Sequence, residues 1–345
     1  VPLVYALLPH YSTDRFWLGG IQANLSMALY FLSLYANLRT LRARPARSWV
    51  WAAWAILSLL GSTLIYEVAV PLFFFNVLLI WYLSPKRRED VSSAKGRVNL
   101  LIISNLLALI ALIIFKVGTS ERITKGGLPR TVHLFSGIIS IFYGIDGYGL
   151  GFPRMVVRVL RYYPDRLILA LGLAVGLLVF GYFYYLTGQL KNPFPKRGAW
   201  LLLIASGLVV LGLGYAIFLT TATGFSKTGI VNRTAIAATA GMSMQLVGGL
   251  GYLSTFLTSS LLKRISFCGA LALLCAAGFV INNTIAKFWV EANRQQKEVL
   301  ADIHTHFPIL PAGSTLILDG ICPSVGPGVV FECHWDLGTA LVMLY

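Results

Sequence analysis

The chain has 345 residues, of which 57% are hydrophobic and only 12% are charged. A soluble domain carries about 25% charged residues, so the composition excludes an ordinary soluble globular protein, and its hydrophobicity excludes a disordered chain. Lys and Arg number 28 against 13 Asp and Glu, a net charge of +15. Because these cations separate apolar runs, they indicate membrane topology rather than nucleic-acid binding. We predict an all-α polytopic membrane protein with the lipid bilayer, and no nucleic acid, as a partner.

Eight apolar stretches approach the roughly 20 residues that a helix needs to cross the hydrocarbon core. They are Phe16–Leu38, Trp49–Ile65, Val68–Ser84, Val98–Val117, Leu167–Thr187, Ala199–Thr221, Ala235–Ser259 and Ile265–Phe288. A ninth stretch, Val132–Phe152, contains His133, Asp146 and several glycines. It is predicted to be an interfacial or re-entrant segment buried in protein, where irregular backbone is tolerated.

The short loops after the first, third, fifth and seventh stretches are rich in Lys and Arg. The positive-inside rule places these loops in the cytoplasm and both termini outside. Residues 1–288 then form the transmembrane domain, with an outer loop over residues 118–166. Residues 289–345 form a small outer α/β segment, with a helix over Lys287–Phe307. Its predicted strands are Ser314–Gly320, Val329–Cys333 and Ala340–Tyr345.

The four cysteines fall into two pairs. Cys268 and Cys275 lie on one face of the last stretch and are predicted to be small core residues. Cys322 and Cys333 lie in the outer segment, where an oxidising compartment would permit a disulfide between them. The cysteines include no pair with Cys-x-x-Cys spacing, so the sequence does not indicate a zinc site.

Four segments on the predicted outer side carry residues that could perform chemistry. The first contains His10, Asp14 and Arg15. An imidazole and a carboxylate at a membrane boundary suit acid–base catalysis or a metal, although Ser12 or Asp14 could equally be an N-cap. A divalent cation is left open as a cofactor.

The second candidate is Glu67, which lies between two apolar runs that are too close for a long loop. It is expected at the outer tip of a tight helical hairpin. A carboxylate at that depth is costly unless it is paired or hydrated, so Glu67 is a candidate catalytic residue beside Asp14.

The remaining candidates are basic. Arg154, Arg158 and Arg161 recur at i, i+4 and i+7 and predict an amphipathic helix on the membrane surface. Its arginines could bind a lipid-linked phosphate or general headgroups. Lys227 and Arg233, in a polar loop before the seventh stretch, could close over an anionic substrate, or simply extend to the interface.

Several of these segments resemble one family. Ala6–Pro9 and the run Ala28–Tyr35 are similar to the entrance and first matched span of GT-C sugar transferases, which include the protein O-mannosyltransferases and bacterial relatives. Leu8 stands in place of the expected His, and His10 follows. Leu57–Gly61 leading to Tyr66–Leu72 resembles the family's Leu-Ser-Lys-Glu hairpin, with Glu67 matching its Glu and Tyr66 replacing its Lys.

Two further segments are similar to bacterial proteins of this type. They are the loop from Gly214-Tyr215 to Asn232-Arg233, and Trp335-Asp336. The family's acid–base aspartate lies upstream of the matched part. Because the chain starts at Val1 and ends inside a predicted strand, we expect it to be a fragment.

The resemblance implies transfer of a sugar from a polyprenyl-phosphate donor to an acceptor hydroxyl, with inversion at the sugar carbon, in the bacterial inner membrane. Arg154, Arg158, Lys227 and Arg233 would hold the phosphate, with His10 and Arg15 nearby. Asp14 and Glu67 would line the cavity. Three alternatives stay open: a polyprenyl-linked glycan ligase or polymerase, a lipid or sugar transporter, and a non-catalytic membrane scaffold.

Overall fold

A computed structural model describes residues 1–43, 45–83, 91–119, 151–190, 194–217, 230–311, 313–331 and 334–345. These residues are almost entirely helical. The long helices are α3 (Ile21–Arg42), α4 (Pro45–Ile65), α5 (Leu72–Leu83), α6 (Val91–Thr119), α9 (Phe152–Tyr162), α10 (Arg166–Gln189), α11 (Arg197–Ala216), α12 (Ile236–Ser254), α13 (Ser260–His306) and α14 (His334–Leu344). Short elements are α1 (Pro2–Leu7), α2 (Ser12–Phe16) and the 3-10 turns η1 (Pro9–Tyr11), η2 (Leu18–Gly20), η3 (Glu67–Ala69) and η6 (Ile230–Ala235).

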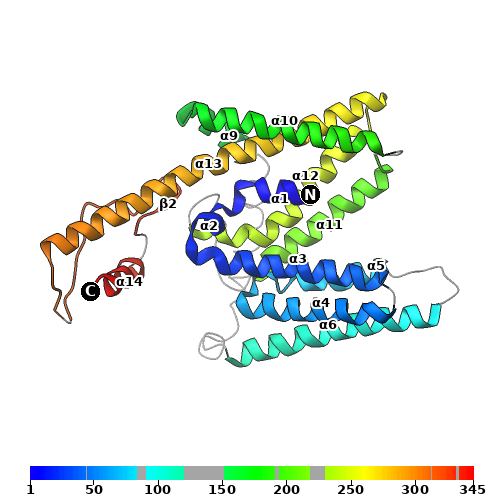
Figure 1. The fold of residues 1–345 in the computed structure, drawn as a ribbon, viewed down its shortest axis with the longest axis horizontal. Helices are drawn as coiled ribbons and strands as arrows, with labels where there is room; N and C mark the ends of the chain where they lie inside the picture. The colour runs from blue at the N-terminus through cyan, green and yellow to red at the C-terminus, as the bar shows by residue number, and fades with distance from the viewer. Residues whose placement is uncertain are drawn as a thin grey trace, which may run out of the picture.

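The long helices run roughly along one direction and form a bundle (Figure 1). α10 and α13 lie along one side, and α3, α4 and α6 lie along the other, while α11, α12 and the short N-terminal helices lie between them (Figure 1). α13 extends beyond the bundle at one end. We call that end the arm end, and the residues of α13 after Phe288 the arm.

Five helices are long and apolar enough to cross a membrane. They are α4, α6, α10, α11 and α13. A multi-pass membrane protein is therefore consistent with the fold, and five of the predicted stretches are confirmed as candidate spans among the described residues.

The other three predicted stretches are helical but differ from the prediction. α5 has 12 residues, about 18 Å of helix, which is shorter than a hydrocarbon core of about 30 Å. Its predicted first residues instead form η3 and a turn at Pro71. α3 and α12 are long but carry many polar or small side chains. Most of α12 is buried among other helices, where lipid-facing apolarity is not required.

Small residues bring α11 and α12 into close contact. A Cβ added to Gly241 of α12 would lie 2.3 Å from the backbone nitrogen of Leu211 in α11. Only glycine permits this approach, as at small-residue contacts between membrane helices. The close packing fixes the position of η6, which directly precedes α12.

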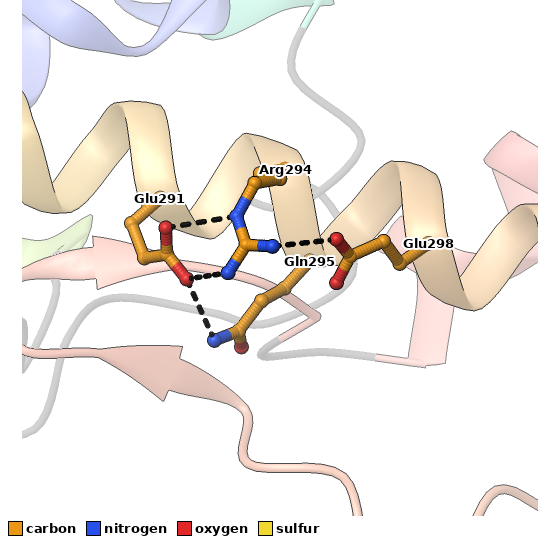
Figure 2. A network of polar contacts seen from close by, with 4 residues as sticks. All are labelled: Glu291, Arg294, Gln295 and Glu298. Carbon is orange, nitrogen blue, oxygen red and sulfur yellow. Dashed lines mark hydrogen bonds and ion pairs between the residues drawn. The ribbon is translucent and has the colours of Figure 1, made fainter.

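The arm continues α13 without a break. The whole of α13 has 47 residues and is about 70 Å long. The predicted helix over Lys287–Phe307 is therefore confirmed as the end of a longer one. Figure 2 shows a polar network on its exposed face, where Arg294 pairs with Glu291 at 2.6 Å and Glu298 at 2.7 Å. Gln295 also donates to Glu291 at 3.3 Å. These i, i+3 and i, i+4 contacts support a helix in water.

The predicted α/β character of residues 289–345 is wrong for the described part. Ser314–Gly320 forms no strand, and Ala340–Tyr345 lies in and just after α14. Only a two-residue hairpin pairs β1 (Ser324–Val325) with β2 (Gly328–Val329). The Ala, Leu and Met side chains of α14 favour a helix, and a short apolar run alone cannot distinguish helix from strand.

The cysteine predictions have mixed outcomes. Cys268 and Cys275 are buried and free in α13, as predicted. Cys322 is exposed, but Cys333 lies outside the described residues, so the disulfide stays a prediction. The re-entrant segment Val132–Phe152 also lies outside the described residues, except at its last two positions.

Candidate functional site

The N-terminal segment lies in the interior of the bundle and brings its polar residues with it. Val4 and Leu8 are buried in the same cluster as several residues of α13. A Cβ on Gly278 of α13 would lie 2.3 Å from the carbonyl oxygen of Leu7. Asn282, one turn later, donates from Nδ2 to that same oxygen at 2.7 Å. α13 therefore fixes the end of α1, and η1 and α2 follow from there.

Residues 10 and 12–14 are nearly or fully buried, although all four are polar. Their side chains are at most 2% exposed. Asn232, 0% exposed in η6, holds this segment. Its Nδ2 donates to the carbonyl oxygen of His10 at 2.6 Å. Its Oδ1 accepts from Ser12 Oγ at 3.4 Å and from the Thr13 backbone nitrogen at 3.5 Å. One carboxamide thus joins two segments more than 200 residues apart.

The Asp14 carboxylate is the most unusual group of this cluster. Neither of its oxygens has a hydrogen-bond partner among the described residues. Burial raises the pKa of Asp14 from 3.8 to about 8, and the nearby Arg233 and Arg15 only partly oppose that rise. A buried carboxyl with a pKa near neutrality can accept or release a proton under physiological conditions.

The two arginines near Asp14 use their guanidinium groups on other partners. Arg15 donates to the carbonyl oxygen of Leu8 at 2.8 Å and lies 4.2 Å from the centroid of the Tyr11 ring. Arg233 lies 5.6 Å from the centroid of the Trp17 ring. Both charges therefore influence Asp14 electrostatically, while its oxygens stay free of hydrogen bonds within the described chain.

The hairpin between α4 and α5 places a fifth predicted residue near this cluster. Glu67 begins η3 and is exposed. Its neighbour Tyr66 is partly buried, and burial raises the pKa of the Tyr66 hydroxyl. Arg233 opposes that rise, while Glu67 and Asp14 add to it. Tyr66 is thus within electrostatic range of all three.

The structure therefore brings together His10, Asp14, Arg15, Glu67 and Arg233 at the arm end. Two other predicted residues, Arg154 and Arg158, are exposed on α9. α9 approaches the cluster through Phe152, whose ring centroid lies 6.0 Å from that of His10. Lys227 lies outside the described residues.

Two residues of the site were not predicted. In the sequence Asn232 is part of the Asn-Arg motif, and Tyr66 replaces the Lys of the family that the chain resembles. Both positions come from the segments that carry the resemblance. That coincidence was the one signal in the sequence that could have indicated them.

A cavity of about 490 Å³ lies next to the cluster, between the segment after Asp14, the arm and α14. Phe16 and Trp17 form one wall, and Trp289 and Gln296 of the arm contribute to another. Trp17 also contacts Arg233, so the cavity and the charged cluster share a wall. Asp14 itself does not line the cavity.

No group of three or more His, Cys, Asp or Glu side chains in the described part of the chain could hold a metal ion. No family model, curated protein or solved structure matches this chain. Functional inference therefore depends on the geometry of the cluster and on the motifs of the sequence.

Proposed function

We propose that the chain is a membrane-embedded glycosyltransferase that moves a sugar from a polyprenyl-phosphate donor to an acceptor hydroxyl at the arm end of the bundle. One observation carries the proposal. A buried carboxylate, Asp14, has free oxygens within the described chain and a pKa of about 8, and it lies within electrostatic range of two arginines.

Asp14 is proposed as the general base. The acceptor hydroxyl would give its proton to the Asp14 carboxylate while its oxygen attacks the sugar C1. The bond between C1 and the phosphate oxygen would break, which inverts the configuration at C1. A base with a pKa near the working pH combines a sufficient deprotonated fraction with a strong driving force for proton transfer.

Arg15 and Arg233 are proposed to stabilise the leaving phosphate. Negative charge grows on the phosphate oxygens as the C1–oxygen bond breaks, and guanidinium groups are suited to that charge. Both side chains now contact aromatic rings, where the cation is incompletely solvated and remains available to an anion. Glu67, at the exposed edge of the cluster, would contact the acceptor or the sugar.

The proposed location is a bacterial inner membrane, with the arm end and both termini outside. The basic loops of the sequence support that orientation. In the structure α2, which carries Asp14 and Arg15, lies at the same end as the arm (Figure 1).

The test is donor turnover by the full chain in proteoliposomes, with radiolabelled polyprenyl-phosphate hexoses as probes. Asp14→Asn should lower the rate about 100-fold or more, since general bases contribute at least that much. The rate of the unmodified chain should rise about tenfold per pH unit below pH 8. Glu298→Gln, which removes an equal charge from the arm, is the control. Unchanged turnover in Asp14→Asn, or no turnover of any donor, would refute the proposal.

A further inference from the structure

α9 has three distinct faces, and the first anchors it to the protein. Phe152 and Val159 are each 8% exposed and pack in the core cluster of α13. Directly after the helix, the Tyr163 ring meets the Phe288 ring edge-on at a centroid distance of 5.1 Å. α9 therefore packs against α13 through this face, whereas the residues on its other two faces are mostly exposed.

The second face carries three arginines. Arg154, Arg158 and Arg161 fall within about 60° of one another around the helix axis, and all three are exposed. None of them forms an ion pair with another described residue. The nearest acid along the sequence, Asp165, pairs with Lys287 and caps α10 through Ile168 N at 3.0 Å. The charge of this face is thus not neutralised by its neighbour.

The third face is apolar and lies between the other two. Val157 is 61% exposed and Leu160 is 49% exposed. A face of this kind would be unfavourable in water but is expected where a helix rests at a bilayer surface. Tyr162 is 60% exposed, and the centroid of its ring lies 5.3 Å from the Arg161 guanidinium carbon. It adds an aromatic group typical of the membrane interface.

The place of α9 in the fold agrees with such a surface. Only three residues separate it from α10, which is a candidate membrane span. α10 measures about 36 Å, slightly more than the hydrocarbon core, so its first residue, Arg166, falls near the membrane boundary. α9 must lie close to that same boundary.

We infer that α9 is a docking surface for anionic phospholipids of the surrounding bilayer, with Val157 and Leu160 against the acyl chains and the three arginines on the headgroup phosphates. A free phosphate ion would not require the apolar face, and a nucleic acid would not reach it at the boundary. The inference is independent of the proposed function, because it concerns structural lipid and not the donor.

The experiment is native mass spectrometry of the full chain in detergent with equal amounts of phosphatidylglycerol and phosphatidylcholine. The unmodified chain should retain phosphatidylglycerol preferentially. Each basic residue near an anionic surface contributes roughly a fivefold preference, so the triple variant R154Q/R158Q/R161Q should lose at least tenfold. The charge-preserving variant R154K/R158K/R161K should keep most of the preference. Because the changed side chains are exposed, thermal unfolding should be unaffected.

Two further arms separate the source of the anion and the effect of net charge. V157S/L160S should weaken phosphatidylglycerol binding, and millimolar inorganic phosphate should not displace the lipid. A second triple variant, R47Q/K196Q/K263Q, removes the same charge at the opposite end of the bundle and should lose less. The inference would be overturned if the unmodified chain showed no preference for phosphatidylglycerol, or if the two triple variants lost that preference equally. It would also be overturned if inorganic phosphate displaced the lipid while V157S/L160S bound it as well as the unmodified chain.

Discussion

Replacing Asp14 with Asn should change how the stability of the protein depends on pH. The unfolded carboxyl titrates near 3.8, and the folded one near 8. Between these values the unfolded chain has released the proton while the folded chain keeps it. Rising pH therefore favours unfolding. The free energy of unfolding falls as the pH rises from about 4 and stops falling near pH 8, where the folded carboxyl also loses its proton. The slope is about 1.4 kcal/mol per pH unit, so roughly 4 kcal/mol disappears between pH 5 and pH 8.

The asparagine variant has a similar shape but no proton to lose, so this contribution to the pH dependence should vanish. Thermal unfolding in detergent, followed by circular dichroism from pH 5 to pH 9, measures the difference. The variant should already be somewhat the more stable near pH 5, and its advantage should grow steadily up to about pH 8. His10 and the nearby tyrosines are present in both proteins, so their titration cancels in the comparison. Parallel curves over the whole range would refute the assigned burial of the Asp14 charge.

Two further substitutions test how the site is held. Gly278→Ala should destabilise the protein by about 1–3 kcal/mol, because the new Cβ would lie 2.3 Å from the Leu7 carbonyl oxygen; Gly269→Ala in the same helix meets nothing within 4 Å and should be neutral or stabilising in the same thermal assay. Asn232→Ala should cost about 1–3 kcal/mol, because it leaves the buried His10 carbonyl without the donor at 2.6 Å; a change below about 0.5 kcal/mol in chemical denaturation would contradict that role.

Much of the helical layout could be predicted because apolar length is a strong signal. Each of the eight stretches coincides with a helix, although only five are long and apolar enough to be candidate spans. α12 shows why the count is harder to predict than the helices. It is rich in Gly, Ala and Ser and is mostly buried by its neighbours. Its environment is set by packing, which hydropathy does not report. The arginine spacing in α9 was equally informative, since a period near 3.6 residues identifies a helix.

The candidate site was only partly predictable. His10, Asp14 and Arg15 are close in sequence, so their grouping required no tertiary information. The hydrogen bond from Asn232 to His10 and the electrostatic effect of Arg233 on Asp14 depend on a fold that joins distant segments, and no periodicity encodes such proximity. The burial of Asp14 was also beyond prediction, because a polar segment at a helix entrance is ordinarily hydrated. The prediction of C-terminal strands was wrong for a related reason, since the apolar runs there are too short to show a period.

The two effects expected for Asp14→Asn have opposite signs, and that opposition separates a functional carboxylate from a structural one. A structural carboxylate satisfies hydrogen bonds or an ion pair, so its removal destabilises the fold. The Asp14 carboxylate has no hydrogen-bond partner among the described residues and the carboxyl has a raised pKa, so burying this group costs stability at neutral pH. Residues that lower stability where they stand are typical of active sites. A variant that is more stable above pH 7 and inactive in donor turnover would place Asp14 in that class, whereas a less stable variant would place it among the structural residues.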